Sequence, residues 1–254
     1  MERIICGRTL DELKKLEDGS IDLILQDPPY NCLEVAWEED IFADGDELLN
    51  EVKRVLKPNG TMILFTSGPF TFRSQVYFSE LFRYKYVWLK QKSTNFIHSK
   101  NKPMTKHEDI LIFSKGVAAH LGQSERRMTY NPQGLIAIAP VTRKTNKENK
   151  NHATPIRTSK ESYTTSWKNY PCDVLSGFPE TSPNNKIHTS EKPVDLLMYL
   201  INTFSNEGEI VFDGYAGSFS TAEAALRTNR QFICVDKIPE FVEKGINRIE
   251  ALRR

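Results

Sequence analysis

The tetrapeptide Asp27-Pro28-Pro29-Tyr30 directly follows the apolar run Ile21–Gln26, where a strand must end because proline cannot donate to a sheet. Asp27 and the carbonyl of Pro28 offer only hydrogen-bond acceptors, on a loop that Pro29 stiffens. Two acceptors on the hydrogens of a conjugated amino group make its nitrogen a better nucleophile, and the ring of Tyr30 offers a stacking face for a base. The tetrapeptide therefore indicates a catalytic site for an exocyclic amino group; the alternative is a plain turn with a surface tyrosine.

A second constellation lies near the far end of the chain, where residues 210–218 run through Asp213 and a glycine turn into a helix-like segment. The acid Asp236 follows the next apolar run, about 20 residues beyond the turn, the spacing of an acid that holds ribose hydroxyls. Asp213 repels a pyrophosphate but suits a ligand with a positive end, such as the amino group of a methionine moiety. This pattern favours S-adenosylmethionine over NAD, although similar glycine turns are common without any ligand.

Short apolar runs rich in Ile, Val and Leu alternate with segments of helical periodicity. The expected strands are 21–26, 61–66, 84–89, 109–113, 209–212 and 232–235, with a strand-like start at residues 1–5, and the expected helices are 44–57, 69–82, 194–204, 220–227 and 239–252. This alternation predicts a mostly parallel sheet with crossover helices. Because the carboxyl ends of parallel strands meet at one edge, the two constellations can face one cleft.

Taken together, Asp27-Pro28-Pro29-Tyr30 and the downstream run Phe212-Asp213-Gly214-Tyr215-Ala216-Gly217 resemble the β-class of S-adenosylmethionine-dependent DNA amino-methyltransferases, the N6-adenine and N4-cytosine family. In that class the catalytic tetrapeptide comes first, a target-recognition region follows, and the cofactor motif comes last. Residues 188–193 are similar to the family segment in which a Ser or Thr and a Lys meet the carboxylate end of the cofactor. Residues 107–113 are similar to a family strand.

The resemblance implies an α/β fold with a Rossmann-like methyltransferase sheet, mostly parallel with one antiparallel strand near the edge, in a circularly permuted motif order. It implies that residues 1–115 form the catalytic part of one domain, residues 116–187 an inserted, loop-rich target-recognition region, and residues 188–254 the cofactor-binding part. The implied catalytic residues are Asp27, Pro28, Pro29 and Tyr30, and the implied cofactor-binding residues are Asp213, Tyr215, Ala216, Gly217, Asp236, Lys192 and Ser190.

The implied activity is site-specific transfer of a methyl group from S-adenosylmethionine to N6 of adenine in DNA, with the target base flipped out of the helix. N4 of cytosine is the alternative acceptor, although Asp at the first position of the tetrapeptide favours adenine in this family. One departure motivates a further alternative. Phe219 stands where the family has glycine, and its bulky side chain is expected to narrow the cofactor pocket. The alternative is therefore a catalytically silent homologue that binds DNA.

Basic residues cluster in two parts of the chain, although the formal net charge is only +1. No acid interrupts the first cluster, between Glu80 and Glu108, and the second lies in the polar, irregular stretch 114–187. Such clusters are typical of a surface that contacts phosphates, and a solvated loop is the alternative. The candidate DNA-binding residues are Lys90, Lys92, Lys100, Lys102, Arg143 and Lys144. Trp167, Tyr170 and Phe178 are expected to anchor the irregular stretch by packing.

Other site and protein classes find little support. The four cysteines form no CxxC pair and the five histidines share no ligand spacing, so we predict free thiols and no metal site. No apolar stretch approaches the ~20 residues of a membrane helix, and no signal peptide is visible, which predicts a cytoplasmic protein with no membrane partner. A homodimer and a cognate restriction endonuclease are partners that the resemblance suggests. Duplex and single-stranded DNA both remain open as substrates.

Overall fold

The computed structural model describes residues 2–30, 40–118, 126–144, 162–180 and 191–254. It divides into two compact units, one of residues 1–131 with 173–254 and one of residues 132–172. The first unit carries the main sheet and both constellations. Among the described residues, no helix is both long and apolar enough to cross a membrane.

One eight-stranded sheet runs through the first unit in the order β1-β10-β9-β2-β3-β5-β4-β8. Its strands are β1 (Glu2–Cys6), β2 (Ile21–Gln26), β3 (Leu56–Thr66), β4 (Phe82–Thr94), β5 (Thr105–Ser114), β8 (Val174–Leu175), β9 (Ile210–Asp213) and β10 (Gln231–Asp236). Neighbouring strands pair in parallel except at β5, which is antiparallel to both β3 and β4. The expected sheet, mostly parallel with one antiparallel strand, is therefore confirmed.

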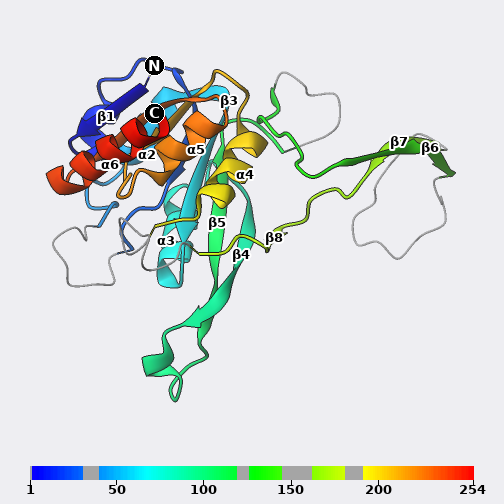
Figure 1. Ribbon diagram of the computed structural model, residues 1–254, viewed down its shortest axis with the longest axis horizontal. Helices are drawn as coiled ribbons and strands as arrows, with labels where there is room; N and C mark the ends of the chain where they lie inside the picture. Colours follow the sequence, from blue (N-terminus) through cyan, green and yellow to red (C-terminus); the bar gives the residue numbers. More distant parts are fainter. Residues whose placement is uncertain (1, 31–39, 119–125, 145–161, 181–190) are drawn as a thin grey trace. The chain divides into compact units, whose positions relative to one another are not determined.

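Helices cover both faces of this sheet (Figure 1). One layer consists of α1 (Thr9–Leu13), α2 (Glu47–Val55) and α3 (Pro69–Tyr77), and the other consists of α4 (Val194–Phe204), α5 (Ser220–Arg227) and α6 (Pro239–Leu252). The helices expected at 194–204, 220–227 and 239–252 are confirmed at those bounds. The helix expected over 44–57 ends earlier, at Val55, because β3 already begins at Leu56.

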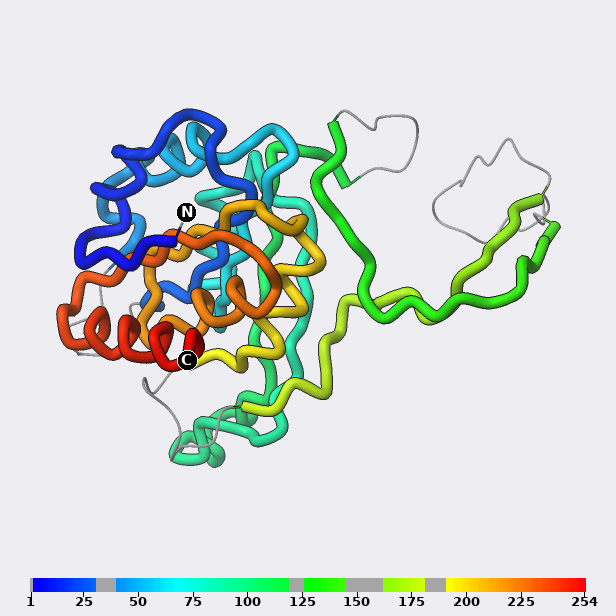
Figure 2. Tube along the Cα trace, turned by 45° about the horizontal axis from the view of Figure 1, so that its top comes forward, coloured from blue at the N-terminus to red at the C-terminus, as the bar shows by residue number. Residues whose placement is uncertain are grey.

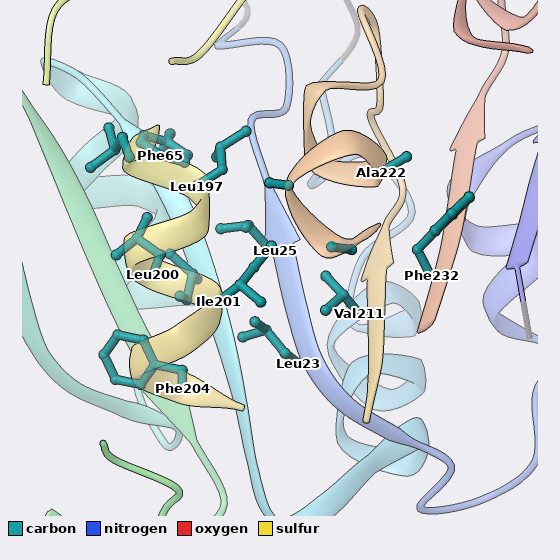
Figure 3. Close-up of a cluster of buried hydrophobic side chains, with 14 of the residues drawn as sticks. Leu23, Leu25, Phe65, Leu197, Leu200, Ile201, Phe204, Val211, Ala222 and Phe232 are labelled. Carbon is teal, nitrogen blue, oxygen red and sulfur yellow. The ribbon is translucent and has the colours of Figure 1, made fainter. Parts of the chain in front are cut away.

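The period-two pattern of a strand assigns alternate side chains to the two layers. In β2, Leu23 and Leu25 belong to the core beneath α4 to α6, whereas Ile24 belongs to the core on the other face. Figure 3 shows the side chains of α4 facing Leu23 and Leu25 across the first of these cores. Full burial of one such side chain contributes roughly 1.5–3 kcal/mol, so the central strand is firmly held from both sides.

Beyond the helical layers, β4 and β5 project from the sheet as a two-stranded arm (Figures 1 and 2). A short 3-10 helix, η1 (Phe96–His98), lies in the connection between them. Phe96 and Ile97 are 76% and 86% exposed there. The arm therefore presents an apolar connection among the lysines of the first basic cluster.

The second unit contains an antiparallel hairpin of β6 (Ile136–Lys144) and β7 (Ser162–Lys168). The sequence predicts only irregular structure here, and the hairpin differs from that prediction. Both strands are mostly exposed, so they bury no apolar face that a periodic pattern could reveal. The expected packing role is wrong for Trp167 and Tyr170, which are 46% and 60% exposed. It is confirmed for Phe178 of the first unit, whose ring lies 5.5 Å from that of Tyr199.

Candidate active site

The two constellations meet where the order of the strands reverses. β2 is hydrogen-bonded to β3 on one side and to β9 on the other. From β2 the chain crosses to β3, and from β9 it crosses to β10 on the opposite side. Ligands of open α/β sheets bind at such a switch point, outside the carboxyl ends of the strands. Asp27 directly follows β2, and Asp213 is the last residue of β9.

A cavity of about 370 Å³ opens at this edge of the sheet. Its lining includes nearly all of the expected catalytic and cofactor-binding residues, namely Asp27, Pro28, Pro29, Tyr30, Lys192, Asp213, Tyr215, Ala216, Gly217 and Asp236. Ser190 lies outside the described residues. Segments nearly 200 positions apart in the sequence thus contribute to one site, as the strand ends predicted.

Asp27 is held through both of its carboxylate oxygens. The hydroxyl of Tyr30 donates to Oδ1 at 2.8 Å, and the ammonium group of Lys192 forms an ion pair with Oδ2. The ring of Tyr30 stacks on Phe70 of α3, with centroids 5.0 Å apart and planes inclined by 24°. Phe70 therefore supports one face of the tyrosine ring. The tyrosine does more than the sequence analysis expected, because its hydroxyl also contacts the carboxylate.

Lys192 lies between two carboxylates, the partly buried Asp27 and the buried Glu108. Its Nζ is 3.4 Å from Oε2 of Glu108, and the other oxygen of Glu108 pairs with Lys90. Burial raises the pKa of Asp27, with Lys192 opposing that effect and Glu108 adding to it. Burial by itself lowers the pKa of Lys192, but the two carboxylates raise it above its usual value. The cluster is thus an alternating row of charges with a firmly protonated lysine at its centre.

Glu108 is the site residue that the sequence analysis did not identify. It lies near the start of β5, and because β5 is antiparallel, that start reaches the edge at which the parallel strands end. Burial opposes its ionisation, yet Lys192 and Lys90 hold the pKa of Glu108 below its usual range. The sequence feature that could have pointed to Glu108 is its place directly before the apolar run 109–113. Its position at the cavity depends on the direction of β5.

Asp213 is buried, but it is held by neutral donors. The backbone N–H of Tyr215 donates to Oδ1 at 3.0 Å, and the hydroxyl of Thr221 also donates to the carboxylate. Among the described residues, no lysine or arginine forms an ion pair with it. Burial therefore raises the pKa of Asp213 to about 7, and the hydrogen bonds only partly offset this.

The turn after Asp213 packs closely against the first strand–helix connection. A Cβ atom on Gly214 would lie 2.2 Å from Cγ2 of Thr9, so only glycine fits there. Thr9 in turn donates to the carbonyl of Gly214 at 2.5 Å. Asp236 accepts hydrogen bonds from the N–H groups of Gly217 and Ile238, both at 2.8 Å. Asp236 therefore fixes the glycine turn in addition to lining the cavity.

Phe219 does not narrow the cavity, contrary to the expectation from its unusual position in the motif. The residue adopts a left-handed conformation with φ of 59° and is fully buried. Its ring faces α6, where a Cβ atom on Gly245 would lie 2.3 Å from Cδ2 of the phenylalanine. Phe219 thus fills a gap between α5 and α6 that the glycine at position 245 leaves open. The main motive for a catalytically silent homologue is thereby removed.

The candidate DNA-binding residues fall into two groups. The expectation that Lys90 contacts DNA is wrong. Its side chain is turned into the cavity, where it pairs with Glu108 and lies 4.0 Å from Glu180. Residues 92, 100 and 102 are exposed lysines of the arm, in the first unit. Arg143 and Lys144 are exposed at the end of β6, in the second unit.

Comparisons with known proteins identify the family of the chain. A family model described as DNA methylase, for N6 and N4 methyltransferases, matches residues 21–247. The DNA adenine methyltransferase YhdJ of Escherichia coli is 30% identical over 97% of this chain and 82% of its own length. The type II methyltransferase M.HpaI of Haemophilus parainfluenzae is 28% identical over 98% of this chain and 74% of its own length.

Solved structures share the fold. The complex of M1.HpyAVI with SAM superposes with a TM-score of 0.64 at 18% identity, covering 98% of this chain and 100% of that one. The cytosine-N4-specific PvuII DNA methyltransferase gives a TM-score of 0.68 at 16% identity, covering 96% and 84%. The family model extends from β2 into α6 and so includes both ends of the cavity. The chain therefore belongs to the N6/N4 family of DNA methylases.

Proposed function

We propose that this DNA methylase transfers a methyl group from S-adenosylmethionine to N6 of adenine at a specific sequence in DNA. The observation that carries the proposal is the pair of carboxylates at the ends of β2 and β9, Asp27 partly buried and Asp213 buried, which line one cavity of about 370 Å³. Asp27 is the first residue of the tetrapeptide that is typical of amino-group chemistry, and Asp213 suits a cationic ligand. One cavity thus offers a place for the acceptor and a place for the donor.

At the Asp27 end, the carboxylate accepts a hydrogen bond from the target amino group and draws electron density towards its nitrogen. The carbonyl of Pro28 serves as the second acceptor. The base enters flipped out of the duplex and stacks on the ring of Tyr30, which Phe70 supports from behind. The amino nitrogen forms a bond to the methyl carbon as the bond between that carbon and the sulfonium sulfur breaks. S-adenosylhomocysteine leaves with that electron pair, and the proton that the nitrogen loses passes to solvent.

At the Asp213 end, the chain holds and orients the donor. S-adenosylmethionine supplies an electrophilic methyl group on a sulfonium. Asp213 accepts hydrogen bonds from the amino group of the methionine moiety. This group supplies a positive charge that none of the described lysines or arginines places against the carboxylate. Asp236, which the backbone N–H groups of Gly217 and Ile238 hold in place, accepts from the ribose hydroxyls. Tyr215, Ala216 and Gly217 form the wall that the cofactor lies against.

Adenine is proposed over cytosine on two grounds. The first residue of the tetrapeptide is aspartate, and the relative at 30% identity is a DNA adenine methyltransferase. The structural likeness to a cytosine-N4-specific enzyme does not oppose this, because at 16% identity it reflects the fold. N4 of cytosine stays the alternative acceptor, since the same acceptors fit either amino group.

DNA contact is proposed for two exposed basic groups, the arm lysines (Lys92, Lys100 and Lys102) and the pair Arg143 and Lys144 of the hairpin. Residues 116–187 then act as the target-recognition region, flanked by a catalytic part, 1–115, and a cofactor-binding part, 188–254. The type II relatives add a cognate restriction endonuclease as a proposed partner. A homodimer and a cytoplasmic location complete the proposal.

The test is transfer of labelled methyl from S-adenosylmethionine to unmethylated genomic DNA, followed by separation of the nucleosides. Label in N6-methyladenine is the expected outcome. Label in N4-methylcytosine would keep the chemistry of Asp27 and replace the acceptor base. A folded protein that binds the cofactor but labels neither base would overturn the proposal, and Asp27→Ala protein gives the background.

A further inference from the structure

The ion pair between Lys192 and Asp27 is not needed to explain how either ligand binds, yet it occupies the centre of the site. The lysine crosses from the segment before α4 to the end of β2, and its ammonium group also lies 5.1 Å from the centroid of the Phe65 ring. Its side chain is only 10% exposed. Burying a lysine this completely is costly unless its partners are fixed, so the arrangement requires a support.

The chain provides that support from two directions. On one side, Glu108 holds the lysine at 3.4 Å and is itself paired with Lys90. On the other side, the neighbouring Glu191 accepts from Arg248 of α6 at 3.1 Å. Arg248 also binds the carbonyl of Ser218 at 3.1 Å and so ties this segment to the turn before α5. Lys192 is thus placed from β5 and from α6 at once.

The two oxygens of Asp27 are therefore not equivalent. Lys192 holds Oδ2, whereas Oδ1 accepts only a neutral hydrogen bond from the hydroxyl of Tyr30 at 2.8 Å. A neutral hydrogen bond contributes less than a buried ion pair and is more easily exchanged for another donor. The hydroxyl of Tyr30 thus stands where an amino N–H of the target base can take its place.

We propose that Lys192 and Glu108 are positioning residues for Asp27. Lys192 holds Oδ2, which keeps the carboxylate ionised and turns Oδ1 towards the target amino group, and Glu108 holds Lys192 in line. The inference rests on the proposed function. It differs from the expectation that Lys192 meets the carboxylate end of the cofactor, because the ammonium group is here committed to the other end of the cavity.

The charges around Asp27 give the proposal a signature in pH. Tyr30, Lys192 and Glu108 face the carboxylate directly, and Asp213 faces it from β9. Lys192 lowers the pKa of Asp27, while Glu108 raises it. The transfer rate is expected to fall at low pH as Asp27 is protonated, and this fall is the acid limb of the pH–rate profile. Removal of the lysine and removal of the glutamate must therefore move the acid limb in opposite directions. A purely structural role predicts no such opposition.

The decisive experiment compares Lys192→Met, Lys192→Arg and wild type in two measurements. These are the cofactor Kd by calorimetry and the pH dependence of the single-turnover rate with cofactor and DNA saturating. We expect Lys192→Met to keep the cofactor Kd within about threefold, to slow transfer about 100-fold, and to move the acid limb up by about 1–3 pH units. Lys192→Arg should restore the position of the limb, because it keeps the charge.

Glu108→Gln tests the second residue and does not depend on the folding of Lys192→Met, because it keeps the ion pair between Lys192 and Asp27. We expect its acid limb to move down by about half a pH unit, opposite to that of Lys192→Met. Glu180→Gln is the matched control, since this carboxylate approaches Lys90 and not Lys192, and its shift should be smaller. A limb that rises or stays in place in Glu108→Gln overturns the role of Glu108.

Cofactor binding that weakens more than tenfold in Lys192→Met, with an unchanged rate at saturation, would make Lys192 a cofactor ligand and overturn the inference. Failure of the proposed function is a separate result, because wild type then labels no adenine or cytosine in the same assay. An active wild type with unaltered pH profiles in all variants overturns the inference alone.

Discussion

Asp27 and Asp213 end neighbouring strands and line the same cavity, yet their surroundings differ. Asp27 is paired with Lys192 and lies in a row of alternating charges that continues to Lys90. Asp213 is more deeply buried than Asp27 and contacts an N–H group and a hydroxyl. Burial raises the pKa of both carboxyls, and within the described part of the chain a lysine opposes this effect at Asp27 but not at Asp213.

The difference shows at which end of the cavity the protein itself provides the counter-charge for the carboxylate. At the Asp27 end the protein provides its own counter-charge, so the acceptor is ready before DNA arrives. At the Asp213 end the described residues provide no counter-charge, and a cationic ligand would bring it. A preorganised end is expected to control the rate of transfer, and a ligand-completed end is expected to control affinity for the cofactor.

The largest effect is expected from Asp27→Ala. The variant removes the acceptor that polarises the amino group, and we expect transfer to fall by at least about 1,000-fold. Affinity for the cofactor should stay within about threefold of wild type, because Asp213 and the glycine turn are unchanged. Single-turnover rates and calorimetry on the same preparation check both statements. A comparable loss in affinity would show that the two ends are not separate.

Asp213→Asn should produce the converse result. Loss of a charged hydrogen bond of roughly 1.5–3 kcal/mol predicts a cofactor Kd about 10 to 100 times higher. In wild type, affinity should fall about tenfold per pH unit below pH 7, because protonated Asp213 no longer attracts a cation. Calorimetry between pH 5.5 and about pH 8.5 measures this slope, which should be absent in the variant.

The same substitution should have the opposite sign in stability. The folded pKa of Asp213, about 7, lies above the ordinary value of an aspartate, so its contribution to stability is fully present below the unfolded pKa and is lost as pH rises through the folded pKa. At pH 8 the ligand-free Asp213→Asn protein should therefore be more stable than wild type, by up to about 4 kcal/mol. Urea unfolding without cofactor gives the comparison, and a less stable variant would contradict it.

A smaller effect separates the ring of Tyr30 from its hydroxyl. Tyr30→Ala removes a stacking face worth about 1–3 kcal/mol, which predicts a loss in transfer rate of roughly 5- to 150-fold. Tyr30→Phe keeps the ring on Phe70 and removes only the hydrogen bond to Asp27, so a loss below about tenfold is expected. Single-turnover rates decide the matter, and equal losses would mean that stacking is not the main role of this residue.

Much of this architecture follows from local sequence. The helices at 194–204, 220–227 and 239–252 lie where their periodicity placed them, because each packs one apolar stripe against the sheet. The strand ends at Asp27 and Asp213 were also readable, since proline or glycine follows an apolar run. These features depend on residues that are close in the chain.

The positions of side chains that depend on contacts between distant segments could not be predicted from the sequence. Glu108 reaches the cavity only because β5 runs antiparallel, and Lys192 faces Asp27 only because Glu191 is held from α6. The inward orientation of Lys90 depends in the same way on Glu108. In each case a charge looked solvent-exposed in the sequence because its partner comes from another strand or helix.

The smallest effect on function is expected from Phe219→Gly. This variant tests whether the packing between α5 and α6 affects cofactor affinity at the Asp213 end of the cavity. The ring is fully buried against Gly245, so Phe219→Gly should lower the free energy of unfolding by about 2–4 kcal/mol, after allowance for the ease with which glycine adopts the left-handed conformation. Cofactor affinity at 15 °C should stay within about threefold, because the ring points away from the cavity. Tighter binding in the variant would mean that the phenylalanine does narrow the pocket. The double variant Phe219→Gly/Gly245→Leu separates these outcomes, because it refills the space near α6 and should recover part of the stability while leaving affinity unaltered.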